Sequence, residues 1–258
     1  MKRSREPDLR FLCERCGYHL KGLLRSDVCP ECGTPVVESL PEKRIGTRWQ
    51  QRPGIRSWWR TMGDLESRSQ RTWQRLAVAK GHNGVLIVVN CLVAGCAPFI
   101  VFVALSVGLG SLLAAVYNTA ILLPIGLGVS AVYLALTIIE GVGIGLISRR
   151  RGWRIHQGMR APILGLASYA WILCTILILI AVLIVLLIGS GKDPWPQVVV
   201  GAGALSGLLQ FEILVYIGMR KMRFANAPGS EKELAESGDT PLPAAAPPPS
   251  PARVEGGE

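Results

Sequence analysis

The stretch VLIVVNCLVAGCAPFIVFVALSVGLGSLLAAVYNTAILLPIGLGVSAVYLALTII, residues 85–139, contains no Lys, Arg, Asp or Glu. A helix needs about 20 apolar residues to cross a bilayer, so a charge-free run of this length must hold more than one span. Two further apolar runs follow at 163–188 and 198–217. The predicted fold class is therefore mainly α, with an α-helical transmembrane bundle over residues 83–224.

We expect four spans, at 85–107, 112–147, 163–188 and 198–217, with a short turn at 108–111. The second stretch is long for one untilted span. We therefore expect Pro124 and Gly126 to kink it, and residues 112–120 to lie at the interface or to re-enter the bilayer. Splitting 85–147 into three spans would give five in all, which is the main alternative.

Basic residues decide between four spans and five. Residues 1–80 hold 17 Lys and Arg against 9 Asp and Glu, and two further basic clusters follow the second and the fourth span, at 149–160 and 220–223. Four spans place all three clusters on one side, as the positive-inside rule requires, whereas five would send one of them outside. The sequence thus favours a multi-pass protein of the inner (cytoplasmic) membrane with both termini in the cytosol.

Two Cys-x-x-Cys pairs lie ahead of the apolar region, in Cys13-Glu14-Arg15-Cys16-Gly17-Tyr18 and Cys29-Pro30-Glu31-Cys32-Gly33. The Gly after each second Cys lets the chain turn with a positive φ. Four thiolates gathered in this way make a tetrahedral site suited to Zn²⁺. We therefore predict a small N-terminal zinc ribbon over residues 1–40, in which Cys13, Cys16, Cys29 and Cys32 hold one structural Zn²⁺.

Disulfides and iron are the rival interpretations of these cysteines. Residues 1–40 contain no apolar core of a signal peptide, so we expect the ribbon in the reducing cytosol, where disulfides are rare. The two motifs also resemble rubredoxin knuckles, which bind iron, but rubredoxins place a much longer segment between the knuckles. Zinc is therefore favoured over iron.

The juxtamembrane segment 41–82 contains a basic amphipathic pattern. As a helix, residues 55–76 would place Ile55, Trp58, Trp59, Met62, Leu65, Trp73 and Leu76 within an arc of roughly 120°. The opposite side would carry Arg56, Arg60, Arg68, Arg71 and Arg75. This pattern favours a helix lying on an anionic membrane surface. A helix packed on the cytosolic ends of the spans is the alternative, and a nucleic-acid surface is not favoured because no basic groove is evident.

Two carboxylates lie inside the apolar region. Glu140 and Glu212 each lie about 12–14 Å inside the cytosolic basic line, at 1.5 Å per helical residue. Because charged carboxylates are costly in lipid, we expect these intramembrane polar residues to face the bundle interior and to share a proton, a cation or a partner such as Asn90 or Tyr169.

Residues 225–258 are rich in Pro, Ala and acidic residues, which predicts a disordered tail. The chain contains no phosphate-binding loop, no His-Glu-x-x-His and no Gly-x-Ser-x-Gly, so we expect no enzymatic activity.

The order of motifs is similar to that of a group of bacterial zinc-ribbon membrane proteins. The matching residues are 13–23 and 29–33, followed by a Trp/Arg-rich segment and several spans. The membrane part resembles the Yip family in layout, and that resemblance implies five spans and a non-enzymatic role in scaffolding or shaping membranes.

Two functions remain open from the sequence. One is a membrane scaffold or adaptor whose cytosolic ribbon docks a protein partner; the other is a transporter or channel component with a regulatory ribbon. The few polar residues within the spans favour the scaffold. Oligomer formation is compatible with either function.

Overall fold

The structure is a computed structural model, and it describes residues 10–78, 81–108, 112–155, 157–188, 195–231 and 234. Within this part of the chain no β-strand forms, and the ribbon contains two isolated bridges and two 3-10 turns, η1 (Val36–Ser39) and η2 (Pro41–Lys43). The helices that follow are α1 (Arg48–Gln51), α2 (Ile55–Ser67), α3 (Ser69–Arg75), α4 (Asn83–Gly108), α5 (Leu112–Arg150), α6 (Gln157–Ala167), α7 (Ala170–Ile188) and α8 (Trp195–Met222). The mainly α fold class is thereby confirmed.

Four helical segments are long and apolar enough to cross a bilayer: Asn83–Ala104, Thr119–Arg150, Gln157–Val185 and Gln197–Met222. They correspond to the four predicted spans. The expected re-entrant segment was wrong, because α5 is one continuous helix and residues 112–120 form its first turns. The kink at Pro124 and Gly126 stays a prediction. Of the turn predicted at 108–111, Gly108 is the last residue of α4, and residues 109–111 lie outside the described residues.

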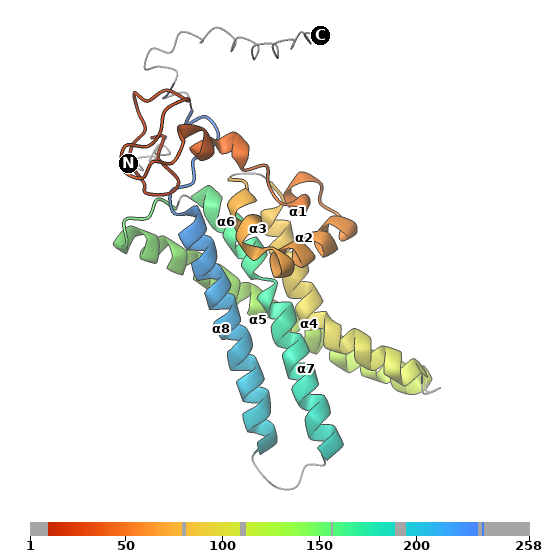
Figure 1. The fold of residues 1–258 in the computed structure, drawn as a ribbon. Coiled ribbons are helices and arrows are strands. Elements are labelled where there is room, and N and C mark those ends of the chain that lie inside the picture. The colour runs from red at the N-terminus through yellow and green to blue at the C-terminus, as the bar shows by residue number, and fades with distance from the viewer. Residues whose placement is uncertain are drawn as a thin grey trace, which may run out of the picture.

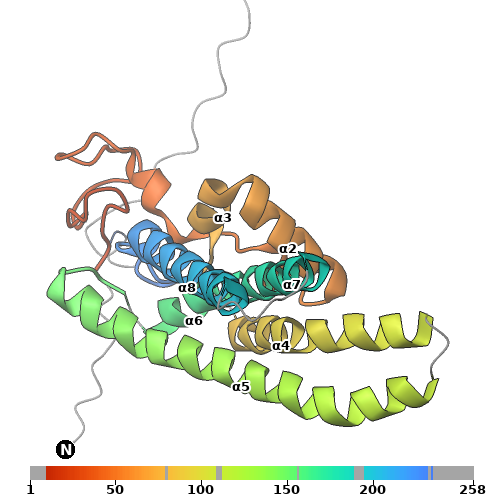
Figure 2. The ribbon, with the colours of Figure 1, turned by 90° about the horizontal axis from the view of Figure 1, so that it is seen from below.

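The spans are arranged as two helical hairpins that diverge from a common base. α7 and α8 run side by side in one direction, whereas α4 and α5 lead away together in another (Figure 1). Figure 2 shows α4 and α5 side by side along most of their length. The ribbon and the short helices α1 to α3 cover the end at which α6, α8 and the start of α4 meet (Figure 1).

The third span is interrupted between α6 and α7, which the sequence did not predict. Asn90 of α4 is fully buried, and its Nδ2 donates to the Gly165 carbonyl (3.1 Å) and to Ser168 Oγ (3.0 Å). Trp58 Nε1 of α2 donates to Asn90 Oδ1 at 2.7 Å. Backbone groups freed inside a membrane need internal partners, so Asn90 stabilises the interruption and joins it to α2.

Asn90→Ala is expected to destabilise the protein by about 2 kcal/mol. The substitution leaves the Trp58 indole N–H buried without its partner, and it removes one of the two donors to the Gly165 carbonyl, which keeps Ser168 Oγ. Denaturant unfolding of the purified protein in mixed micelles measures this loss. Gln210→Ala is the matched control, because Gln210 is a half-buried amide without a hydrogen bond to any described residue, and we expect it to cost about 0.5 kcal/mol or less. Equal losses in both variants would contradict the role given to Asn90.

The amphipathic segment 55–76 is packed on the bundle, and it is two helices rather than one. Trp58, Met62 and Trp73 are buried in the same hydrophobic core as the spans. The structure therefore agrees with the alternative interpretation of this segment, in which it covers the ends of the spans. Trp59 remains 65% exposed and Ile55 79% exposed, so only this part of the apolar face is open to a membrane surface.

An aromatic stack fixes the centre of the bundle. The ring of Trp171 on α7 stacks on Tyr133 of α5 at 4.8 Å and on Phe211 of α8 at 4.5 Å, and its Nε1 donates to Thr137 Oγ1 at 2.9 Å. Gly207 lets α7 and α8 approach closely, because a Cβ atom there would lie 2.2 Å from the sulfur of Cys174. Stacking and close backbone approach thus hold α5, α7 and α8 together.

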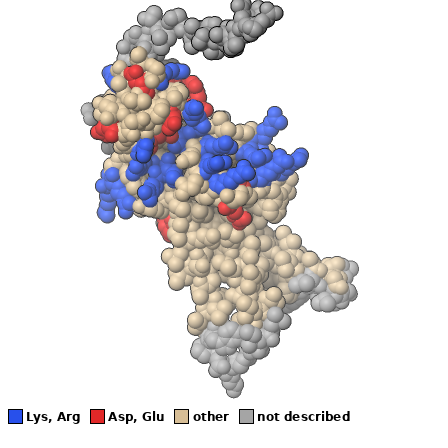
Figure 3. All heavy atoms as spheres, viewed as in Figure 1, with Lys and Arg blue, Asp and Glu red and all other residues tan. Residues whose placement is uncertain are grey.

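Basic residues gather in a belt between the ribbon and the apolar helices (Figure 3). This segregation matches the predicted orientation, in which the belt faces the cytosol. We expect reporter fusions after Gly110 and Gly191 to be active outside the cytosol, and fusions after Gly152 and Pro228 to be active inside. A combined alkaline phosphatase and fluorescent-protein assay distinguishes the two sides. An outside signal at Pro228 would instead require an odd number of spans.

Candidate metal centre

Each Cys-x-x-Cys pair forms a tight turn closed by its own backbone. The N–H of Gly17 donates to the Cys13 carbonyl at 2.8 Å, and the N–H of Gly33 donates to the Cys29 carbonyl at 2.9 Å. Gly17 and Gly33 have φ values of 85° and 68°, a backbone conformation that residues with a Cβ atom rarely adopt. The two halves of the ribbon therefore repeat the same turn, as the sequence predicted.

The two turns bring the four cysteines together. Their sulfur atoms all lie within 4.8 Å of one another, and the Sγ atoms of Cys13 and Cys32, like those of Cys16 and Cys29, are 3.5 Å apart. Four sulfur donors at these separations can hold one metal ion, and such a set suits a tetrahedral ion that binds thiolate. All four donors come from the chain, which is the arrangement of a structural site.

The thiols differ in how readily they lose a proton. Burial raises the pKa of Cys13 and Cys16 above the ordinary value for a thiol. Cys32 Sγ lies 3.2 Å from Thr34 Oγ1, and hydrogen bonding with the side chain and the backbone of Thr34 lowers the pKa of Cys32 to about 6. Thiolates are the metal ligands, so metal binding supplies the free energy that deprotonates Cys13 and Cys16.

The ribbon buries little apolar surface of its own. Besides the cysteines, its buried core consists of Phe11, Leu20, Val36, Leu40 and Leu234. Leu234 and the buried Ala225, Asn226 and Ser230 belong to the segment that we had assigned to the disordered tail, so the ordered chain continues past residue 225. The remainder of that predicted tail, 235–258, lies outside the described residues.

A buried arginine fastens the ribbon to the bundle. The Arg44 side chain is 4% exposed and forms two hydrogen bonds to the carboxylate of Glu14, at 2.8 and 2.9 Å, within the first Cys-x-x-Cys turn. Its remaining N–H groups donate to the carbonyls of Trp73, Leu76 and Lys221 at 3.3–3.5 Å. Arg44 thus joins the metal-site turn to α3 and to the end of α8.

Asn226, four residues after α8, makes a second fastening. Its Nδ2 donates to the carbonyls of Leu12 (2.7 Å) and Ser39 (2.8 Å), and its Oδ1 accepts the N–H of Leu12 at 3.0 Å. Its own N–H donates to the Glu14 carboxylate at 3.4 Å. Neither Arg44 nor Asn226 belongs to a recognisable motif, and we did not identify either from the sequence.

The two intramembrane carboxylates lie on different helices. Glu140 on α5 is half-buried and Glu212 on α8 is exposed. The expected enclosure within the bundle interior is thus not seen for Glu212.

The side chains named as possible partners of the carboxylates bind elsewhere. Asn90 binds Trp58 and the α6–α7 interruption, and the Tyr169 hydroxyl donates to Glu66 of α2 at 2.5 Å. Both contacts join the spans to α2 rather than to the carboxylates.

The predicted arginine stripe stays on the outside of the juxtamembrane helices. Arg56, Arg60, Arg71 and Arg75 are exposed, and Arg68 is exposed at the junction of α2 and α3.

Comparison of the chain with protein-family models, with curated proteins and with solved structures finds no match. The class of protein is therefore defined by the structure alone: a multi-pass helical membrane protein with a four-cysteine cluster near its N-terminus. The resemblance to bacterial zinc-ribbon proteins and to the Yip family stays a prediction.

Proposed function

We propose that this chain is a non-enzymatic membrane scaffold or adaptor of the inner membrane, in which one structural Zn²⁺ holds a cytosolic ribbon that docks a protein partner. The observation that carries this proposal is that two buried side chains attach the ribbon to the bundle. Buried Arg44 and Asn226 join it to the base of the bundle. A module held in this way presents its outer surface in a fixed position relative to the membrane, which suits docking.

The outer surface of the ribbon supports a protein partner over nucleic acid. Leu24 is 40% exposed and Val28 is 55% exposed, and both belong to the loop that joins the two cysteine pairs. Exposed aliphatic side chains of this kind are typical of protein contacts. The closed set of four cysteine ligands also favours a structural over a catalytic ion, because no ligand position is left for a substrate.

Photocrosslinking in native membranes tests the docking role. A photoreactive residue at Val28 is expected to capture one discrete protein, and this product should disappear in Cys29→Ser, which removes a metal ligand. Ile55 is the matched control, because it is also aliphatic and exposed but lies on α2. Identical products from both positions, or a Val28 product that survives Cys29→Ser, would contradict the proposal.

A transporter or channel component is the second candidate, and the presence of Glu140 and Glu212 within two of the membrane-spanning segments favours it. Carboxylates of this kind can form a proton or cation site within the membrane. Flux in proteoliposomes distinguishes the two functions. Proton or cation flux that is lost in the double variant Glu140→Gln/Glu212→Gln would establish transport, whereas the scaffold predicts no flux above protein-free vesicles.

A further inference from the structure

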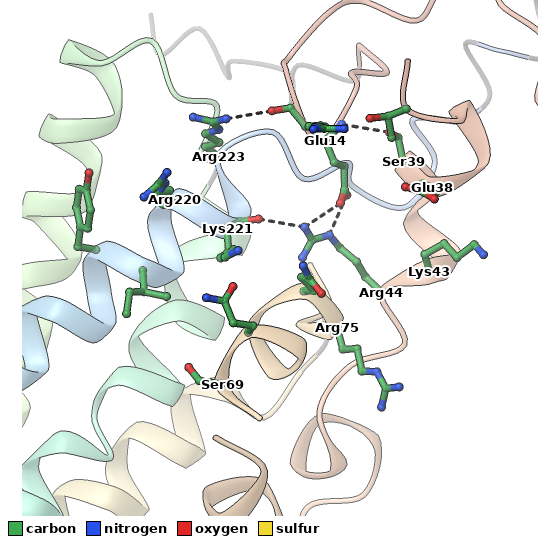
Figure 4. Close-up of a pocket in the computed structure, with 16 residues that line it drawn as sticks. Glu14, Glu38, Ser39, Lys43, Arg44, Ser69, Arg75, Arg220, Lys221 and Arg223 are labelled. Carbon is green, nitrogen blue, oxygen red and sulfur yellow. Dashed lines mark hydrogen bonds and ion pairs between the residues drawn. The ribbon is translucent and has the colours of Figure 1, made fainter. Parts of the chain in front are cut away.

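A cavity of about 880 Å³ lies between the ribbon, α3 and the cytosolic end of α8. Figure 4 shows the side chains that surround it, which come from four separate segments of the chain. Seven of the lining residues are basic and two are acidic. The cavity therefore has a strong positive potential, and charges on walls of low dielectric constant focus that potential inward.

Among the residues that the structure describes, most of these positive charges have no carboxylate partner. Arg44 is paired with Glu14, and the other lining carboxylate, Glu38, is exposed. Arg75 of α3 and Arg220 and Lys221 of α8 form no side-chain ion pair with any residue that the structure describes. Holding several like charges around one space costs free energy, and an anion in that space would offset the cost.

We propose that this cavity binds a phosphate-bearing ligand. Guanidinium groups donate two parallel hydrogen bonds to phosphate oxygens, and the lining includes such groups from Arg75 on α3 and from Arg220 and Arg223 at the end of α8. Arg223 also donates from Nη2 to the Arg15 carbonyl at 3.0 Å. Gln70 and Gln74 of α3 add neutral donors for the groups attached to the phosphate. The chemistry is thus that of a phosphate with at least two negative charges rather than that of a carboxylate peptide.

The position of the cavity favours the headgroup of an anionic lipid as the source of the phosphate. Tyr216 and Ile217 line it from the last turns of α8, a helix long enough to span the bilayer. Basic residues at this end of a span lie at the depth of lipid phosphates. A soluble phosphate compound shares the same chemistry, so the experiment separates the two sources.

Isothermal titration of the full-length protein in a neutral detergent tests the site. The probes are dioctanoyl phosphatidic acid for the lipid source, inorganic pyrophosphate for the soluble source, and dioctanoyl phosphatidylcholine as the zwitterionic comparison. We expect phosphatidic acid to bind one site per chain, and Arg220→Gln/Lys221→Gln to weaken that binding about tenfold or more. The matched control Arg149→Gln/Arg150→Gln removes the same charge from the exposed end of α5, outside the cavity, and should change the Kd by less than about twofold.

The titrations decide whether the site exists and which source supplies the phosphate. Phosphatidic acid binding about tenfold tighter than pyrophosphate identifies the lipid source, and pyrophosphate binding as tightly at the same residues identifies the soluble one. The absence of saturable binding of both anions, or equal weakening by the two double variants, overturns the proposal. If Arg220→Gln/Lys221→Gln lowers the melting temperature of the unliganded protein, Arg75→Gln takes its place, and an unchanged Kd in that variant likewise overturns the site.

Discussion

Cys29→Ser is expected to abolish metal binding and to unfold the ribbon while the membrane helices stay folded. Structural zinc supplies about 10–16 kcal/mol of binding free energy in small zinc domains, whereas the ribbon buries only five apolar side chains besides its cysteines. Hydrogen exchange measured by mass spectrometry should show loss of protection across residues 11–40. It should also show loss across 225–231, because Asn226 binds the ribbon backbone.

The same substitution at Cys96 is the control. Cys96 lies half-buried in α4, outside the cluster, so Cys96→Ser should retain the metal and the full exchange protection of the ribbon. A ribbon that stays protected in Cys29→Ser, or in the presence of a chelator, would contradict a fold that depends on the metal.

Arg44→Met is expected to destabilise the protein by about 3–5 kcal/mol and to detach the ribbon from the bundle. The Met side chain fills a similar volume but leaves the partly buried Glu14 carboxylate without its arginine, which is the costly way to break a buried ion pair. The backbone carbonyls of Trp73, Leu76 and Lys221 lose a donor as well. Denaturant unfolding in mixed micelles measures the loss.

Arg48→Met provides the comparison for a solvent-exposed pair. Arg48 binds Asp64 at 3.1 Å, but the two side chains are 52% and 36% exposed, so we expect a loss of about 0.5 kcal/mol or less. Restoring most of the stability with the double variant Arg44→Met/Glu14→Gln would confirm that the uncompensated carboxylate is the main cost. Similar small losses in Arg44→Met and Arg48→Met would show that Arg44 does not fasten the ribbon.

The spans could be predicted because hydropathy and charge are local properties of the sequence. The interruption between α6 and α7 could not, since neither Ser168 nor Tyr169 is a strong helix breaker. The interruption depends on Asn90, whose amide reaches Gly165 across a separation of 75 residues. The division of 55–76 into α2 and α3 was missed for a related reason, because amphipathic periodicity continues across the turn at Arg68.

The candidate metal ligands could also be predicted, because the Cys-x-x-Cys spacing and the following Gly are themselves the signal for the turn. The residues that place this site on the bundle carry no such signal. Arg44 follows Lys43 in a basic segment and looks like a solvated surface residue, and Asn226 stands at the edge of a Pro-rich tail. Only the folded chain brings both against the first cysteine turn.

Elemental analysis of the full-length protein, purified without added metal, tests the central claim most directly. The claim is that Cys13, Cys16, Cys29 and Cys32 together hold one structural Zn²⁺, on which the docked ribbon depends. We predict one zinc per chain in the wild-type protein and in Cys96→Ser, and none in Cys29→Ser. Iron with a red chromophore, or a metal content that Cys29→Ser leaves unchanged, would contradict it.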